Sequence, residues 1–321
     1  MKKYFAMLAM GAMMSTAVAA DFPGRETVTI NLGFPAGGGM DVMTRIIQRQ
    51  VEEILGNTVI IDYRPGAGGN IASNFVAKAK PTGHTLLVGT AATHGINDAL
   101  YKDLTFDVEA DFTPIAKFVD APNVLVINPS AVNADNIEDF AKEVKANPGK
   151  YSYASSGYGT SGHLATADVF ARMGLEVEHV PFKGGPDAML SLLRGEVCCF
   201  LTQVQVALSQ LKNEQIKAVA VTTKDRVSAL PDVPTMSETV LPDYENSLWF
   251  GLFGPAGMDA AVVDTLSSAV GEALKQDSVV KDLEALGNVV SYQDAATFKE
   301  TVKNDRIRWT KIVNDIGVKI E

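Results

Sequence analysis

Apolar and polar residues follow two patterns that alternate along the chain. Short runs rich in β-branched and aromatic residues are typical of buried strands, and most are followed by stretches whose apolar residues recur every three or four positions, as in helices. The predicted strands are 27–34, 58–63, 85–89, 124–128, 151–155, 177–181, 197–202, 216–222 and 248–253. The predicted helices are 41–55, 70–80, 96–101, 136–146, 161–173, 186–194, 262–274, 279–286 and 295–316. Strands separated by helices predict an α/β fold with mainly parallel sheets and helices on both faces.

These elements fall into two series, which predicts two lobes. A chain of 321 residues exceeds what one compact core usually accommodates. We expect residues 21–122 together with 232–321 to form a discontinuous first lobe and residues 123–231 to form the second. The chain would cross between them near 120–123 and 223–234. A cleft between two such lobes is the default place for a ligand.

The first twenty residues have the features of an export signal. Lys2 and Lys3 precede an apolar stretch at 5–14, and small residues follow at 17–20. This order is that of a secretory signal peptide, and the apolar run is short for a membrane span. We expect residues 1–20 to be removed by cleavage near Ala19 or Ala20, and the mature protein to be periplasmic.

Composition and charge argue against several classes of function. The chain has 38 acidic and 28 basic side chains, a net charge of -10 and no sustained basic run, which argues against nucleic acid as a partner. The two cysteines, Cys198 and Cys199, are too few for a disulfide framework or a multi-cysteine zinc module. We expect two buried thiols that point to opposite faces of a strand. No metal or cofactor is expected, since the four histidines lack a dense metal-binding spacing.

Residues 34–41 (FPAGGGMD) join a predicted strand to the start of a helix. Three glycines let a ligand approach the backbone closely, and the free N–H groups at a helix N-terminus suit an anion. Asp41 is suited to capping the helix, which would order the loop. The alternative is a tight turn without a ligand. The candidate ligand-binding residues are Phe34, Ala36, Gly37, Gly38, Met40 and Asp41.

Residues 155–164 (SSGYGTSGHL) connect a strand to a helix in the second series. Their hydroxyls, and the backbone donors at their glycines, offer a second anion site. Open α/β sheets bind ligands outside the carboxyl ends of their strands, so one such loop in each lobe predicts a two-ended clamp for a small anion. The candidate residues are Ser155, Ser156, Gly159 and Thr160. His163 is expected to pack the loop or to donate to the ligand.

Catalytic and nucleotide motifs are weak. The chain has no HExxH and no GxSxG, although a Ser-His-Asp triad could assemble from residues distant in sequence. The stretch 64–70 (RPGAGGN) lacks the third glycine of a dinucleotide loop and the lysine of a P-loop, which favours a structural turn. Trp249 and Trp309 are expected in the core. No catalytic residue is predicted.

Several stretches, in their order and spacing, match one known family. They are 34–41 with Arg45, 64–69 (RPGAGG), 81–87 (PTGHTLL), 97–101, 111–114 (DFTP), 155–164, 179–184 (HVPFKG), 230–235 (LPDVPT) and 249–257. They run through almost the whole mature chain. On these motifs the chain resembles the periplasmic substrate-binding proteins of tripartite tricarboxylate transporters, of the TctC or Bug type.

The resemblance implies a two-lobed periplasmic binding protein of the Venus flytrap class, type II. Such a protein captures a small organic carboxylate, for example a di- or tricarboxylate, and delivers it to inner-membrane permease subunits; we expect a monomer. In the family, the loops matching 34–41 and 155–160 hold the ligand's carboxylates with backbone amides, hydroxyls and ordered water. This chain departs from the family at Met40, where threonine is frequent, and at Cys198 and Thr202-Gln203, where aspartates are common.

Two other functions stay open at this point. A binding module of the same fold could signal to a membrane sensor kinase through a surface that one sequence does not reveal. A periplasmic hydrolase of carboxylate esters needs a base near Ser155 or Ser156. A structure with no histidine or carboxylate within hydrogen-bond reach of either hydroxyl would exclude the hydrolase.

Overall fold

The computed structural model describes residues 22–212 and 214–318, and its strands form a single mixed sheet. The predicted signal peptide lies outside the described residues. In space the strand order is β2-β1-β3-β9-β4-β7-β5-β6, and both β8 and β10 pair with β4. The bounds are β1 (Val28–Leu32), β2 (Val59–Tyr63), β3 (Thr85–Thr90), β4 (Phe112–Ile127), β5 (Ser152–Ser155), β6 (Glu178–Pro181), β7 (Cys199–Gln203), β8 (Lys217–Val221), β9 (Ser247–Pro255) and β10 (Val289–Gln293).

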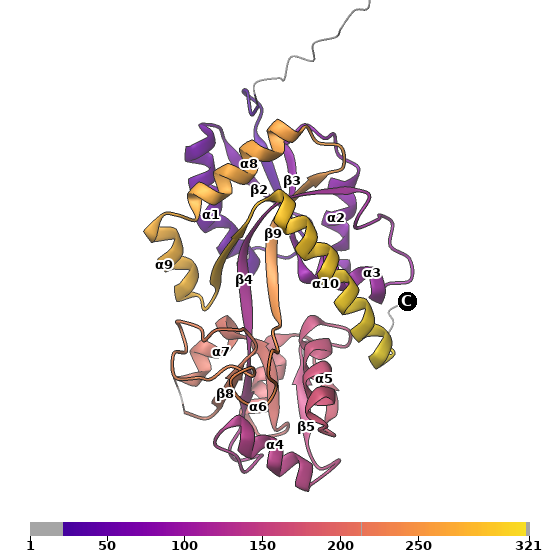
Figure 1. Ribbon diagram of the computed structural model, residues 1–321, viewed down its shortest axis with the longest axis vertical. Helices are drawn as coiled ribbons and strands as arrows, with labels where there is room; N and C mark the ends of the chain where they lie inside the picture. Colours follow the sequence, from indigo (N-terminus) through magenta and orange to yellow (C-terminus); the bar gives the residue numbers. More distant parts are fainter. Residues whose placement is uncertain (1–21, 213, 319–321) are drawn as a thin grey trace, which may run out of the picture.

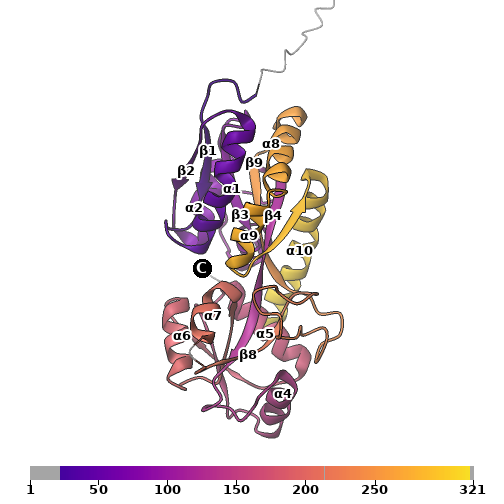
Figure 2. The ribbon, with the colours of Figure 1, turned by 90° about the vertical axis from the view of Figure 1, so that its left-hand side faces the viewer.

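Helices surround this sheet in an upper and a lower group (Figure 1). They are α1 (Gly39–Leu55), α2 (Asn70–Ala77), α3 (Asn97–Leu100), α4 (Ile137–Ala146), α5 (Ser161–Met173), α6 (Gly185–Leu193), α7 (Val204–Leu211), α8 (Ala260–Ala273), α9 (Asp277–Ala285) and α10 (Ala295–Ile316). Helices α1, α2, α8 and α9 lie in the upper half, and α4 to α7 lie in the lower half. Figure 2 shows β4 running from one half into the other. Within the described part of the chain, no helix combines the length and apolar character that crossing a membrane requires.

The sheet is parallel on its flanks and antiparallel at its centre. In the upper half β1 pairs in parallel with β2 and β3, and in the lower half β5 pairs in parallel with β6 and β7. The central strand β4 is antiparallel to β7, β8, β9 and β10. The prediction of mainly parallel sheets is therefore wrong at the centre. Strand β4 carries the chain from the upper half to the lower and β9 starts its return, so the two run in opposite directions.

Strand β4 is much longer than the segment 124–128 that the sequence indicates. Its first part contains Pro114 and Lys117, which interrupt the apolar pattern. Lys117 is nevertheless buried, because its ammonium group lies 2.8 Å from the Asp120 carboxylate. The hydrophobic pattern of the sequence also fails to predict β10 and α7. An ion pair between two residues of one strand satisfies a buried charge that hydrophobic periodicity treats as exposed.

The chain stays with the lower half until residue 246. The Val221 N–H donates to the carbonyl of Pro234 at 2.9 Å, and the Met236 N–H donates to the carbonyl of Val221 at 2.9 Å. The Asn246 N–H then donates to the carbonyl of Thr222 at 2.8 Å. Strand β9 begins at the next residue, so the return to the upper half occurs at 246–247.

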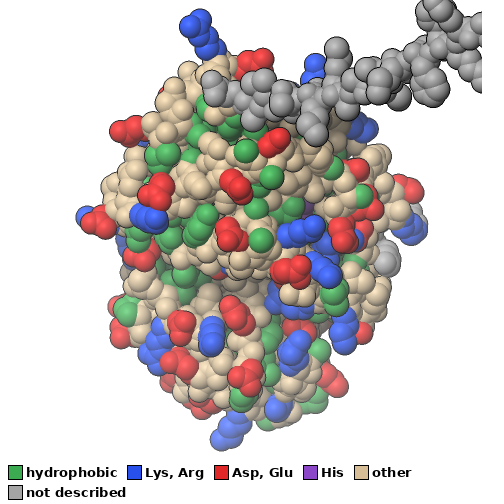
Figure 3. Space-filling model, turned by 45° about the horizontal axis from the view of Figure 1, so that its top comes forward, with side chains coloured by type: hydrophobic (Ala, Val, Ile, Leu, Met, Phe, Trp, Pro, Cys, Tyr) green, Lys and Arg blue, Asp and Glu red, His purple; other side chains and the backbone are tan. Residues whose placement is uncertain are grey.

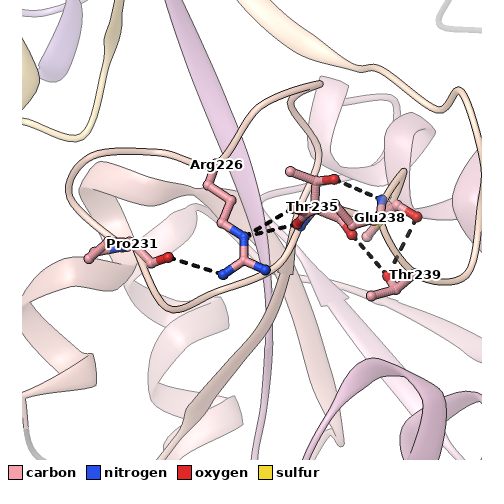
Figure 4. Close-up of polar contacts among 6 residues, drawn as sticks. Arg226, Pro231, Thr235, Glu238 and Thr239 are labelled. Atoms are coloured by element: carbon pink, nitrogen blue, oxygen red, sulfur yellow. Dashed lines mark hydrogen bonds and ion pairs between the residues drawn. The ribbon is translucent and has the colours of Figure 1, made fainter.

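Reciprocal polar contacts order the segment between β8 and β9 (Figure 4). The Thr235 N–H donates to the Glu238 carboxylate at 2.7 Å, and the Glu238 N–H donates to the Thr235 hydroxyl at 2.9 Å. The Arg226 guanidinium bridges the Glu238 carboxylate, at 3.0 Å, and the Pro231 carbonyl, at 3.3 Å. Thr239 donates its hydroxyl hydrogen to the Thr235 carbonyl at 2.9 Å. These contacts fix a long connection without regular secondary structure.

Both tryptophans lie in the core, as predicted. Trp249 and Trp309 are buried, and their indole N–H groups donate to the same oxygen of Asp305, at 2.8 and 3.2 Å. Trp309 and Ile312, from the second half of α10, belong to a buried cluster that also contains Leu125 and other residues of the lower half. Helix α10 therefore packs against both halves.

The two cysteine thiols are buried, as predicted, but their placement differs from the prediction. The Sγ atoms of Cys198 and Cys199 lie 3.3 Å apart, and both residues belong to one core cluster. The prediction of opposite faces is wrong because β7 begins only at Cys199. The strict alternation of side chains applies within a strand and not to the residue before it.

Candidate functional site

Helix N-termini gather at the carboxyl edge of each parallel flank. In the upper half β1 leads into α1, whereas in the lower half β5, β6 and β7 lead into α5, α6 and α7. Because β7, β5 and β6 are parallel neighbours, the starts of those three helices share one edge of the sheet. A Cβ on Gly185, at the start of α6, would lie 3.7 Å from the Ser156 hydroxyl oxygen, beside the start of α5.

In the upper half the Asp41 carboxylate organises the loop before α1. One carboxylate oxygen accepts the Gly37 N–H at 2.8 Å. The other accepts the Tyr63 hydroxyl at 2.6 Å and lies 2.9 Å from Nε of Arg45. The Arg45 guanidinium also donates to the Tyr63 hydroxyl. Burial alone would raise the pKa of Asp41, but the hydrogen bonds from Tyr63 and Gly37 and the charge of Arg45 outweigh burial and lower it.

Asp41 orders the loop without capping the helix. Helix α1 begins at Gly39, so its N-cap residue is Gly38, which has no side chain to accept a hydrogen bond. The prediction that Asp41 is the cap is wrong, because Asp41 lies inside the first turn and reaches back to Gly37. Gly37 takes the positive φ, 82°. The first-turn N–H groups of a helix have no partner within the helix, and here no side chain caps them.

In the lower half Thr160 caps α5. Its hydroxyl accepts the His163 N–H at 3.4 Å and donates to the Gly157 carbonyl at 2.8 Å. The Gly159 N–H donates to Nδ1 of His163 at 3.1 Å. That amide is therefore engaged within the loop, and His163 packs the loop, as expected of it. Tyr158, at the loop tip, is 55% exposed.

The Ser155 hydroxyl is buried and already satisfied. Its oxygen lies 2.6 Å from Nε2 of His179 and 3.0 Å from the Gly157 carbonyl, and it accepts the Gly157 N–H at 3.2 Å. Ser155 has no exposed surface. A histidine thus lies within reach of Ser155, so the geometric criterion that would exclude a hydrolase is not met.

Sequence reasoning missed two residues of this region. His179 reaches Ser155 through the parallel register of β5 and β6, which pairs it with Tyr153. Gln205, in the first turn of α7, lies against the start of α1: a Cβ on Gly39 would be 2.7 Å from its side-chain oxygen. The one signal in the sequence near Gln205 is at Thr202-Gln203, where this chain lacks the aspartates that are common in the family.

The structure brings the predicted residues together within each loop. Between the two halves, the start of α1 at Gly39 lies against Gln205 of α7. Within the upper loop the residues from Phe34 to Gly38 are exposed, whereas Met40 and Asp41 are buried. Within the lower loop Ser156 and Thr160 are partly exposed, whereas Ser155 and Gly159 are buried.

Comparison with known proteins identifies the family. Residues 43–318 match the model of the tripartite tricarboxylate transporter family receptor. The chain belongs to this family. A protein from the tcbD-tcbE intergenic region of Pseudomonas sp. strain P51 is 34% identical over 95% of this chain and 91% of its own length. The resemblance inferred from the sequence motifs is confirmed.

Solved structures of similar proteins have the same fold. A protein from R. palustris, solved with adipate, has 30% sequence identity and a TM-score of 0.80, covering 93% of this chain and 99% of its own. MatC from Rhodopseudomonas palustris, solved with bound malate, has 32% identity and a TM-score of 0.75, covering 91% of this chain and 100% of its own. The α/β fold of two-lobed periplasmic solute-binding proteins, and the function of a solute receptor, are thereby established for this chain.

Proposed function

We propose that this protein binds a small organic carboxylate in the periplasm, between two lobes, and delivers it to the inner-membrane permease of a tripartite tricarboxylate transporter. Export of the mature chain after loss of residues 1–20 and a monomeric state belong to the same proposal. Adipate and malate, the ligands of the two R. palustris structures, are both dicarboxylates. They support a ligand that carries a carboxylate for each loop.

The uncapped start of α1 carries this proposal. Its first-turn N–H groups follow an exposed loop without lysine or arginine, and the Asp41 contacts hold that loop in place. A helix N-terminus attracts an anion through these N–H groups and its dipole. We assign direct ligand contacts to the backbone of Ala36 and of residues 38–40, to Phe34 and to Ser156, because the Gly37 N–H is held by Asp41. Asp41, Ser155, Gly159 and Thr160 hold the loops in shape.

The same proposal sets the boundary between the two lobes at two points of the chain. One is 122–123 in β4, where the chain enters the lower half, and the other is 246–247, where it returns to the upper half. The first lobe is then 22–122 with 247–318, and the second is 123–246, because residues 234–246 hydrogen-bond to the end of β8 and the residue after it. This is a later return than the sequence prediction of 232. Closure about these strands would bring the starts of α1 and α5 toward the ligand.

Titration calorimetry of the mature protein against mono-, di- and tricarboxylates, with neutral sugars as a control, tests the proposal. Binding of at least one acid with Kd in the micromolar range, about 8 kcal/mol, is expected. A few hydrogen bonds to a charged group, each contributing about 1.5–3 kcal/mol, suffice for that affinity. Binding of sugars without binding of any acid would refute the carboxylate receptor.

Ester hydrolysis is the second candidate, because His179 lies 2.6 Å from the Ser155 hydroxyl. A nucleophile needs access to its substrate, and Ser155 is buried. Its hydroxyl also lies 3.0 Å from the Gly157 carbonyl, an acceptor that competes with His179 for its hydrogen. We propose that the protein is not an enzyme. Release of 4-nitrophenol from its acetate ester by the wild type, lost in Ser155→Ala, would overturn this.

A further inference from the structure

Four rings form a continuous stack under the loop that precedes α5. The rings of Tyr153 and His179 have centroids 4.9 Å apart, those of His179 and His163 are 3.8 Å apart, and those of His163 and Tyr158 are 5.2 Å apart. The angles between successive ring planes are 25°, 10° and 31°. The stack therefore runs from a buried tyrosine to the loop tip with its planes roughly aligned.

The outer end of the stack is open and lies beside the proposed ligand site. Tyr153 is buried, whereas Tyr158 is 55% exposed. Tyr158 precedes the N-cap residue Thr160 by only two positions. A carboxylate on the first turn of α5 would therefore place the body of its molecule near this ring. In the other half, Phe34 offers a second exposed ring from the loop before α1.

The histidines in the stack are neutral near pH 7. The Gly159 N–H donates to Nδ1 of His163, so that nitrogen carries no hydrogen. Burial and the neighbouring His179 lower the pKa of His163 to about 4, and burial lowers the pKa of His179. The stack adds no positive charge to the site. Its outer ring can attract a ligand only through its face, its edge and its hydroxyl.

An exposed tyrosine by itself needs no explanation, because single apolar side chains are common on protein surfaces. Tyr158 differs because the His163 ring, which itself stacks on His179, packs 5.2 Å below it and restricts its motion, so less conformational freedom remains to be lost when a second ring stacks on it. Stacked or edge-to-face aromatic pairs contribute beyond the area that they bury. A preorganised ring beside an anion site is the arrangement that an aromatic acid would use.

We propose that the ligand of this protein is a carboxylic acid that carries an aromatic ring, and that this ring stacks on Tyr158. The inference rests on the proposed carboxylate site and restricts its ligands from small organic carboxylates in general to those with an aromatic ring. It also separates this chain from the two R. palustris proteins, whose ligands adipate and malate have no ring.

Matched acids that differ only in the ring test this inference. The binding of acetate and phenylacetate, and of succinate, cyclohexylsuccinate and phenylsuccinate, is measured by calorimetry on the mature protein. The phenyl acids are expected to bind about tenfold more tightly than their unsubstituted partners, and phenylsuccinate more tightly than cyclohexylsuccinate. Cyclohexylsuccinate controls for the extra apolar area, because its ring has similar size but no π face.

Variants of Tyr158 test whether this ring causes the tighter binding of the phenyl acids. Tyr158→Phe keeps the ring and should keep the preference, whereas Tyr158→Leu keeps an apolar side chain and should remove it. Tyr292→Leu, which removes another exposed tyrosine in β10, is the matched control and should leave the preference intact. Equal affinities within each pair, or a preference that survives Tyr158→Leu, would overturn the inference.

The two proposals fail in different ways. If aliphatic acids bind tightly and the phenyl acids bind no better, the carboxylate receptor stands and the aromatic ligand is refuted. If no acid in this set or in the wider carboxylate panel binds, both proposals are refuted. Thermal melting of each variant without ligand shows whether it is folded, and an unfolded Tyr158→Leu is replaced by Tyr158→Met, which also lacks the ring.

Discussion

Replacing Asp41 by asparagine tests whether one carboxylate orders the loop before α1. The native carboxylate accepts from three donors: the Tyr63 hydroxyl and Nε of Arg45 at one oxygen, and the Gly37 N–H at the other. Asparagine supplies one oxygen and one NH2 group. If its oxygen faces Tyr63 and Arg45, its NH2 group faces the Gly37 N–H, and two donors oppose each other. The loop then loses the contact that holds Gly37.

The size of the effect follows from these contacts. The lost hydrogen bond to a charged acceptor contributes about 1.5–3 kcal/mol. The ion pair adds less than about 1 kcal/mol, because the Arg45 side chain is 49% exposed and solvent screens it. The sum is roughly 2–4 kcal/mol, and each kcal/mol lowers the melting temperature of a chain of this size by about 2 °C. We expect Asp41→Asn to melt roughly 4–8 °C below the wild type.

The pH dependence of this difference has a defined sign. The folded pKa of Asp41 lies below its unfolded value, which is about 3.9. Its stabilisation is therefore fully present above pH 5, and it is lost as the pH falls through the folded pKa. The gap in melting temperature between wild type and Asp41→Asn should stay constant from about pH 5 to 8 and narrow below about pH 4.

Differential scanning calorimetry across this pH range measures the difference in melting temperature. Titration of the variant with the best-bound acid measures its affinity, which shows whether the loop keeps the shape that binding requires. Tyr63→Phe is the matched control, because it removes one donor and leaves the carboxylate, Arg45 and Gly37 in place. The lost hydrogen bond to the carboxylate should lower stability by about 1.5–3 kcal/mol, but Gly37 keeps its acceptor, so acid binding should not change. An Asp41→Asn protein that melts within about 1 °C of the wild type at pH 7 and binds equally well would refute this account.

Gly37→Ala should destabilise the free protein by about 1–2 kcal/mol, because Gly37 has φ of 82°, in the left-handed region that is unfavourable for a residue with a Cβ. No atom lies within 4 Å of the added methyl group, so the effect comes from the backbone and not from a clash. Gly38→Ala, at φ of -77°, should not destabilise the protein, and equal melting temperatures of the two variants would contradict this. Thr160→Val removes the cap of α5 and should weaken acid binding about tenfold, more than Lys183→Gln, which lies outside both loops; the reverse order in calorimetry would exclude a backbone clamp. Small-angle scattering should show a smaller radius of gyration with saturating acid, and an unchanged radius would exclude lobe closure.

The parts of the fold that sequence analysis predicts well depend on neighbouring residues. The amphipathic pattern of 295–316 gives α10 with the same bounds, and Gly174 ends α5 in the left-handed conformation where the pattern stops. These features are predictable because periodicity, caps and turn residues act over a few positions of the chain. The surface also agrees with the absence of a sustained basic run in the sequence: on the face seen in Figure 3, acidic and basic side chains are mixed, with no large patch of one sign.

The candidate site is predictable only in part. The glycines before α1 and the threonine before α5 mark two loops, because each determines its own helix start. The sequence by itself therefore determined most of the elements, the family and the two segments that we propose face the ligand. It gave no sign that the Gly159 amide binds His163 or that His179 reaches Ser155.

Only the tertiary structure decided those contacts and the direction of the central strands. His179 meets Ser155 through the register between β5 and β6, which hydrogen bonds between distant segments fix. Gln205 meets the start of α1 because β4 and β9 cross between the halves and set how α7 faces it. A one-residue change in strand register would move every side chain to the other face, and no local pattern encodes that choice.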